Sequence, residues 1–78
     1  MHFVYLLKCS DNTIYTGCTE NLEERKSRHD NGYVASTCKK LPVDLINYFA
    51  FQDKQKAFLF EKYLKSGSGI AFRNKRLL

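Results

Sequence analysis

FVYLLKCSDNTIYTGC, residues 3–18, contains two segments rich in strand-forming side chains on either side of a polar turn. Phe3–Cys9 and Ile14–Cys18 are dominated by aromatic, aliphatic and β-branched residues, which favour a pleated, half-buried surface. Between them, Ser10-Asp11-Asn12 is a cluster of turn-forming residues. The pattern predicts a β-hairpin in the first part of the chain.

The length of the turn sets which side chains share a face of this hairpin. A three-residue loop with Asn12 in the left-handed conformation pairs Tyr5 with Gly17 and places Tyr5 and Tyr15 on the same face. A loop of two or four residues shifts the register and moves the two tyrosines to opposite faces. A site that uses both phenols therefore requires the three-residue loop.

A helix is predicted after the hairpin. Asn21 is suited to the N-cap position, and Glu24 three positions later gives a pattern similar to a capping box. Asn31-Gly32 is a typical helix stop. Residues 32–42 then show no periodicity and are interpreted as an irregular loop.

One face of this helix combines a single apolar residue with two cationic or polar ones. Leu22, Arg25 and His29 are spaced to lie on the same face, and Leu22 is the only large apolar residue of the helix. We expect this face to pack on the sheet, although an ordinary surface helix has an aliphatic inward stripe. The alternative is a poorly anchored helix whose Arg25 and His29 point to solvent.

The remaining residues predict a strand and two helices. Val43–Phe51 combines β-branched and aromatic residues, which is typical of a strand. We expect Asp53 to cap a helix that runs to about Ser66 and stops at Gly67, and Ser68 to cap a short last helix. The predicted order of elements is ββαβαα, which indicates an α+β fold.

One acid interrupts the apolar face of the helix that follows Asp53. At about 100° per residue, Glu61 falls between Ala57 and Phe58, inside the apolar arc. A carboxylate there is costly unless it is paired, hydrogen-bonded or bound to a metal ion. A structural salt bridge with a neighbouring Lys or Arg is an equally good interpretation of Glu61 taken alone.

The composition indicates a small basic protein. The chain has 78 residues and a net charge of +5, and we interpret residues 1–78 as one domain. Residues 54–78 carry seven Lys or Arg residues against one acid, Glu61. This asymmetry favours a polyanionic partner, whereas a solvated basic face is the simpler alternative.

Three further features indicate an intracellular protein. No apolar run is long enough to span a membrane, and the first residues lack the basic region and apolar length of a signal peptide. Cys9, Cys18 and Cys38 include no CxxC pair, which favours reduced thiols over a disulfide framework or a zinc site.

The polar residues on these elements match the needs of phosphodiester hydrolysis: an activated water, charge stabilisation at the phosphate and help for the leaving oxygen. Glu61 is suited to hold Mg²⁺, which binds through one or two carboxylates, waters and substrate phosphate. Arg25 offers a bidentate fork of donors that stays charged. Tyr5 and Tyr15 are candidates to orient or deprotonate the water, and His29 to contact phosphate or relay a proton.

These residues, in this order, resemble the GIY-YIG nuclease domain, in particular its small stand-alone bacterial members. Phe3-Val4-Tyr5 stands at the first motif of the family name, and Tyr15-Thr16-Gly17 stands at the second. Asn21–His29 resembles the arginine-bearing helix of the family, and Glu61 stands at its metal-binding glutamate. Residues 65–73, KSGSGIAFR, are similar to the stand-alone members.

The resemblance implies a small three-stranded antiparallel sheet flanked by helices. It implies catalytic roles for Tyr5, Tyr15, Arg25, His29 and Glu61, with Glu61 as the ligand of one Mg²⁺ or Mn²⁺ ion. Together with the basic C-terminal segment, it indicates a set of nucleic-acid contacts: Arg25, Lys65, Arg73, Asn74 and Lys75. Two positions depart from the family pattern, since Phe3 replaces a glycine and Cys18 lies where some members have a lysine.

The sequence thus predicts a metal-dependent endonuclease acting on DNA, with branched, nicked or damaged DNA of the kind met in DNA repair as candidate substrates. RNA stays open as a substrate, and a protein partner is a candidate source of specificity. One alternative is a nucleic-acid-binding module without turnover. Another is a small interaction domain that uses Tyr33, Tyr48 and Tyr63, for which core or rim positions are the simpler expectation.

Overall fold

The protein, described over all 78 residues by a computed structural model, has an α+β architecture in the order ββαβαα. The predicted fold class and element order are confirmed. The strands are β1 (His2–Lys8), β2 (Ile14–Thr19) and β3 (Asp44–Phe51). The helices are α1 (Leu22–Asp30), α2 (Lys54–Leu64) and α3 (Gly67–Arg76).

The three strands form one antiparallel sheet in the order β2-β1-β3, so β1 is central and β2 is an edge strand. In the β1–β2 register, Tyr5 lies opposite Gly17 and Leu7 lies opposite Tyr15. The β1–β3 register is irregular between Leu6 and Leu7. Because side chains alternate between the faces of a strand, this register places Tyr5 and Tyr15 on the same face.

The turn between β1 and β2 is the predicted three-residue loop. Asn12 has a φ of 69°, which lies in the left-handed region that asparagine tolerates. The backbone N–H of Cys9 donates to the carbonyl of Thr13 at 2.9 Å and closes the loop. The prediction of the hairpin and of its register is therefore confirmed.

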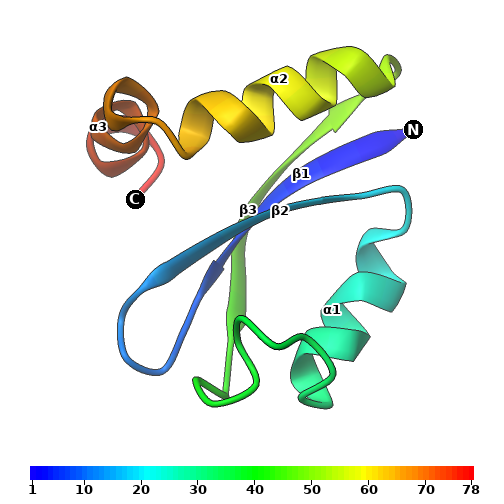
Figure 1. Cartoon of the computed structure of the whole chain (residues 1–78), viewed down its shortest axis with the longest axis vertical. Coiled ribbons are helices and arrows are strands. Elements are labelled where there is room, and N and C mark those ends of the chain that lie inside the picture. Colours follow the sequence, from blue (N-terminus) through cyan, green and yellow to red (C-terminus); the bar gives the residue numbers. More distant parts are fainter.

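The helices lie on both faces of the sheet (Figure 1). α2 and α3 cover one face, where Val4 and Leu6 of β1 pack with Ala57 and Leu64 of α2. α1 and the segment that follows it lie on the other face. The buried residues there form a second cluster: Tyr5, Leu7, Cys9 and Val43. No helix is both long enough and apolar enough to cross a membrane.

Both capping predictions for the starts of α1 and α2 are confirmed. The side chain of Asn21 accepts a hydrogen bond from the backbone N–H of Glu24 at 3.0 Å. The side chain of Asp53 accepts one from the backbone N–H of Gln55 at 2.8 Å. Each bond satisfies one of the N–H groups that have no partner inside a helix.

The prediction for the junction of α2 and α3 is wrong by two residues. α2 ends at Leu64, and Ser66 rather than Ser68 caps α3 by accepting a hydrogen bond from the backbone N–H of Gly69 at 3.1 Å. Gly67 does not stop α2, because it is the first residue of α3. It also lacks the positive φ of a glycine helix stop, which in this chain only Gly32 adopts among the glycines.

Gly69 has a packing role that its position in the sequence does not reveal. A Cβ at this position would overlap the carbonyl group of Tyr63. The glycine therefore lets α3 approach the end of α2 closely. This approach fixes how the C-terminal basic residues sit against the rest of the molecule.

The expectation of core or rim positions is wrong for two of the three tyrosines named above. Tyr33 is 72% exposed and Tyr48 is 54% exposed. Tyr63 is 41% exposed and stacks on Phe60, with ring centroids 6.5 Å apart. These rings thus leave aromatic surface open to solvent.

Candidate active site

Tyr5, Tyr15 and His29 form a compact cluster on the α1 face of the sheet. The ring centroids of Tyr15 and His29 are 4.9 Å apart, and those of Tyr5 and His29 are 5.8 Å apart. The Oη atom of Tyr5 lies 3.0 Å from Nε2 of His29, within hydrogen-bonding distance. The hairpin register supplies both phenols, and the inward face of α1 supplies the imidazole.

Gly17 provides the space in which Tyr5 lies. A Cβ on residue 17 would overlap Cζ and Oη of the Tyr5 ring. The ring of Tyr5 therefore crosses over the β2 backbone at the one residue without a side chain. The group that Gly17 admits is the phenol of Tyr5.

His29 is completely buried, with no exposed surface. Its Nδ1 lies 2.7 Å from Oγ1 of Thr37, a residue that is 1% exposed. Burial lowers the pKa of His29, and the positive charge of Arg25 lowers the same pKa further. The imidazole is therefore neutral at neutral pH. The alternative in which His29 points to solvent is wrong.

Thr37 was not identified from the sequence. It lies in the irregular segment between α1 and β3, where no motif or periodicity marks it. The one available indication was indirect, because a buried imidazole needs a hydrogen-bond partner for each ring nitrogen.

Tyr5 is a protonated phenol at neutral pH. Burial raises the pKa of Tyr5 well above its usual value, and the nearby Tyr15 raises that pKa further. Arg25 lies close enough to oppose this rise with its positive charge. For Tyr5 to act as a base, its proton must first move to a neighbour, and His29 Nε2 is the acceptor within reach.

Arg25 projects from α1 beside Tyr5 and His29, since its charge acts on the pKa of both. The residue is partly buried, and its Nε atom is buried without a hydrogen-bond partner. A buried donor left unpaired costs about 1–3 kcal/mol. A guanidinium in this state is prepared to donate to an anion, which would satisfy the unpaired group.

Glu61 lies on α2, which packs on the opposite face of the sheet from α1 (Figure 1). Its side chain is 17% exposed, and its Oε2 pairs with Nζ of Lys65 at 3.1 Å. The structure therefore contains the salt bridge that the sequence left open as an alternative. No hydrogen bond or ion pair joins Glu61 to Tyr5, Tyr15 or His29.

Cys18 on the edge strand β2 is close enough to Glu61 and to Arg25 for both charges to act on its pKa. Burial raises the pKa of the Cys18 thiol, the negative charge of Glu61 raises it further, and the positive charge of Arg25 lowers it. Both charges thus reach the same edge strand, each from its own face of the sheet. The carboxylate and the guanidinium flank β2 and do not touch each other.

A hollow of about 290 Å³ connects Tyr15 with the predicted basic surface. Lys65 and Arg73 line it together with Tyr15 and Thr16. Arg73 donates to Oδ1 of Asn74 through Nε at 3.3 Å and through Nη2 at 3.2 Å. Lys65 and Arg73 are therefore beside the tyrosine cluster, and Asn74 adjoins them through Arg73.

Lys75, the last of the predicted nucleic-acid contacts, is exposed in the final turn of α3. It does not line this hollow.

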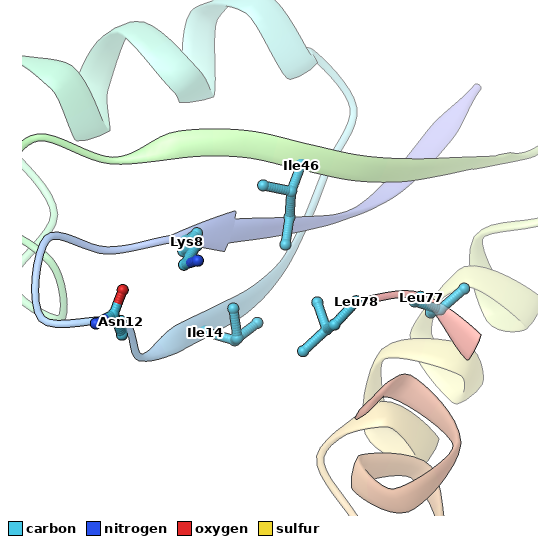
Figure 2. Close-up of a pocket in the computed structure, with 6 residues that line it drawn as sticks. All are labelled: Lys8, Asn12, Ile14, Ile46, Leu77 and Leu78. Atoms are coloured by element: carbon cyan, nitrogen blue, oxygen red, sulfur yellow. The ribbon is translucent and has the colours of Figure 1, made fainter. Parts of the chain in front are cut away.

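A second hollow, of about 400 Å³, has no such chemistry. Figure 2 shows its lining, in which the apolar side chains come from the hairpin, β3 and the C-terminal residues: Ile14, Ile46, Leu77 and Leu78. Lys8 and Asn12 complete it. It contains no carboxylate, imidazole or phenol, so it is not the candidate active site.

The donor set for a metal ion is limited to one carboxylate at this edge of the sheet. No group of three or more His, Cys, Asp or Glu side chains is arranged to hold an ion. Glu61 is acidic, shielded from solvent on most of its surface, and paired only with the exposed ammonium group of Lys65. This fits a Mg²⁺ or Mn²⁺ ion that takes its other ligands from water and substrate phosphate, and it does not fit an all-protein cage.

Comparisons with known proteins agree with the fold. The GIY-YIG catalytic domain matches residues 1–74. A UPF0213 protein of Clostridium perfringens is 44% identical over 66 residues, covering 83% of this chain and 71% of the relative. A UPF0213 protein of Staphylococcus saprophyticus is 35% identical over 77 residues, covering 97% of this chain and 89% of the relative.

A solved structure is also similar. The solution NMR structure of a UPF0213 protein from Bacillus halodurans matches with a TM-score of 0.61 and 29% sequence identity. The match covers 97% of this chain and 85% of that chain.

Proposed function

The chain belongs to the GIY-YIG family of nuclease domains, and on this premise we propose that it is a divalent-metal-dependent endonuclease that hydrolyses phosphodiester bonds in DNA. One observation carries the proposal: Tyr5, Tyr15 and His29 meet on one face of the sheet beside Arg25, whose buried Nε has no partner. An anion that approaches this cluster meets the Arg25 guanidinium and the partly exposed Tyr15, with Tyr5 and His29 buried behind them.

Arg25 binds the scissile phosphate in this proposal. Its fork of donors matches phosphate oxygens, and its charge does not depend on pH. Partial burial strengthens the attraction, because charges interact more strongly where water is excluded. The α1 helix holds the group in place, so little reorganisation accompanies the reaction.

Tyr5 and His29 act as a pair in proton transfer. Tyr5 relays a proton: as its Oη takes the proton of the attacking water, its own phenolic proton moves to Nε2 of His29, so no free phenolate forms. Tyr15, whose ring lies against that of His29, orients the water or the phosphate. This division of roles follows from the burial of Tyr5 and the partial exposure of Tyr15.

Glu61 holds the divalent ion, which, when bound, stabilises charge on the phosphate and on the leaving oxygen. Lys65 is the present partner of this carboxylate, and it is 56% exposed at its side chain. Release of the lysine leaves its ammonium group free to contact a neighbouring phosphate. The remaining cations beside Tyr15 extend the surface along the substrate.

Recognition of the sugar-phosphate backbone and of DNA shape fits this small basic surface better than base readout. Branched, nicked or damaged DNA is the substrate class that we propose, and RNA is the competing class for the same chemistry. An intracellular place of action is part of the proposal and agrees with three cysteines that are free in the structure.

The test is a nicking assay with purified protein, supercoiled plasmid and Mg²⁺ or Mn²⁺. We expect cleavage that Arg25→Ala and Glu61→Gln each abolish. Arg28→Ala is the matched control, since Arg28 lies on the same helix but is exposed and reaches only Glu24, at 3.9 Å. Nicking that continues unchanged in both site variants would mean that a contaminant cleaves the plasmid.

A nucleic-acid-binding module without turnover is the second candidate. The pairing of Glu61 with Lys65 favours it, because the carboxylate that would hold the ion already has a cationic partner. Salt-sensitive DNA binding, with no cleavage in the presence of any divalent ion, would establish this second function.

A further inference from the structure

Three buried polar side chains form a continuous line across the α1 face of the sheet. Tyr5 of β1 contacts His29 of α1, and His29 contacts Thr37 of the segment between α1 and β3. The two distances are 3.0 Å and 2.7 Å, and each of the three residues is at most 1% exposed. Because almost none of their surface is exposed, these three side chains satisfy one another's hydrogen bonds.

A neutral imidazole has one N–H donor and one acceptor nitrogen, so two arrangements satisfy His29. In the first, Nδ1–H donates to Thr37 Oγ1, and Nε2 accepts from the Tyr5 hydroxyl. In the second, the Thr37 hydroxyl donates to Nδ1, and Nε2–H donates to Tyr5 Oη. A phenol is a far stronger acid than an aliphatic hydroxyl, so the stronger bond is the one from the phenol to nitrogen. This favours the first arrangement.

The backbone around Thr37 holds its hydroxyl in place. The N–H of Thr37 donates to the carbonyl of Val34 at 3.1 Å, and the N–H of Lys40 donates to the carbonyl of Thr37 at 2.8 Å. These consecutive turns fix a residue whose side chain points into the core. A threonine placed only to fill space would need no alignment with Nδ1, since valine has the same shape.

We propose that Thr37 is a positioning residue, whose Oγ1 accepts the hydrogen bond from His29 Nδ1–H and so keeps Nε2 free to take the proton of Tyr5. The inference rests on the proposed function, because it supports the step in which Tyr5 becomes a base. In that step the Oη–H bond of Tyr5 breaks and an N–H bond forms at Nε2. Nδ1–H keeps its hydrogen bond to Oγ1 of Thr37, and Oη of Tyr5 takes up the proton of the attacking water in the same step.

The direct test is NMR on protein labelled with ¹⁵N at histidine. The chain has two histidines, and His2, which lies 3.6 Å from Glu20, gives a second set of signals for reference. We expect His29 to show a protonated Nδ1 and an unprotonated Nε2. In Thr37→Val we expect the Nε2–H form to become populated, and in Thr37→Ser we expect the wild-type pattern to return.

The rate of nicking should follow the tautomer. We expect Thr37→Val to lower the rate by at least about 10-fold, as loss of an orienting partner does at other sites, and Thr37→Ser to restore most of it. Ser36→Ala is the control, because Ser36 is an exposed neighbour with no hydrogen bond of its own, and it should leave both readouts unchanged. Thermal unfolding followed by circular dichroism confirms that each variant is folded.

The outcomes separate this inference from the proposed function. A wild-type His29 protonated at Nε2, or a Thr37→Val variant with unchanged tautomer and rate, would overturn the role of Thr37 even if the protein cleaves DNA. The expected tautomer in a wild-type protein that cleaves no nucleic acid would leave the hydrogen-bond assignment intact and overturn the proposed function.

Discussion

Tyr5 lies directly opposite Gly17 in the β1–β2 register, and its ring occupies the space that a side chain at residue 17 would fill. The phenol reaches Nε2 of His29 only by crossing β2 at this point. The two motifs of the family name are therefore one structural unit: the glycine of the second creates the position of the tyrosine of the first.

Gly17→Ala tests this relationship. The added Cβ overlaps Cζ and Oη of Tyr5, so the ring must move away from His29. We expect a loss of about 1–3 kcal/mol in the free energy of unfolding, the usual range for overpacking in a core. We also expect a large drop in the nicking rate. Urea denaturation and plasmid nicking measure the two effects.

Gly67→Ala is the matched control. A Cβ at Gly67 has no neighbour within 4 Å, and the residue opens α3 without a positive φ. We expect its stability to match the wild type or to rise by about 0.4–1 kcal/mol. Equal destabilisation by the two substitutions would show that the crowding of Tyr5 is not the cause.

Tyr5→Phe removes the hydroxyl and keeps the ring. We expect the nicking rate to fall by about 10²–10⁴-fold, the contribution typical of a general base. The fold should persist, because the phenylalanine ring still fills the space over Gly17, while His29 loses one hydrogen-bond partner. Single-turnover cleavage measures the effect, and a rate within about 3-fold of the wild type would exclude Tyr5 as the base.

Glu61→Gln should separate metal binding from stability. The Glu61–Lys65 pair has i,i+4 spacing on one helix with a half-exposed lysine, so its loss costs only about 0.3–0.5 kcal/mol. We expect Mn²⁺ binding, followed by electron paramagnetic resonance, to weaken and nicking to stop while the melting temperature changes little. Mn²⁺ binding equal to the wild type would place the ion at other ligands.

Lys65→Gln and Arg73→Gln should each reduce the salt dependence of DNA binding. Both residues line the hollow beside Tyr15, where a phosphate contact releases counterions. We expect the slope of log K against log salt to become shallower by about 1 for each variant. Lys26→Gln serves as the control, because Lys26 lies on α1 and does not line this hollow, and its slope should not change.

The hairpin could be predicted from sequence because its information is local. Ser10-Asp11-Asn12 sets the loop length, Asn12 accepts the left-handed conformation, and together they fix the register that joins Tyr5 to Gly17. The same holds for the caps at Asn21 and Asp53, whose partners lie within three residues. Local rules of this kind need no knowledge of the tertiary structure.

The features that could not be predicted from the sequence depend on contacts in the folded structure. Local rules predict a stop at Gly67 and a cap at Ser68, whereas Gly69 packs closely against Tyr63 and Ser66 is the N-cap of α3. Thr37 has no local mark at all, since only the burial of His29 gives it a partner. The sequence allows two equal interpretations of Glu61, a metal ligand or a salt bridge with a neighbouring cation. The i,i+4 spacing of Glu61 and Lys65 alone does not separate them.

Burial of His29 predicts a loss of stability in acid. Its pKa is lowered in the folded state by burial and by Arg25, whereas the unfolded chain titrates near the ordinary value of about 6.5. Between the two pKa values the unfolded state binds more protons, so stability rises with pH through this window. The contribution of neutral His29 is thus complete above about pH 6.5 and is lost as the pH falls through the lower, folded pKa.

The variant Arg25→Gln tests the cause of this shift. In Arg25→Gln the pKa of His29 in the folded state should rise, so the loss of stability in acid should become smaller. Urea denaturation of the wild type and of His29→Gln from pH 7.5 to pH 4.5 measures how the free energy of unfolding depends on pH. Equal pH dependence in the two proteins would contradict the role of His29.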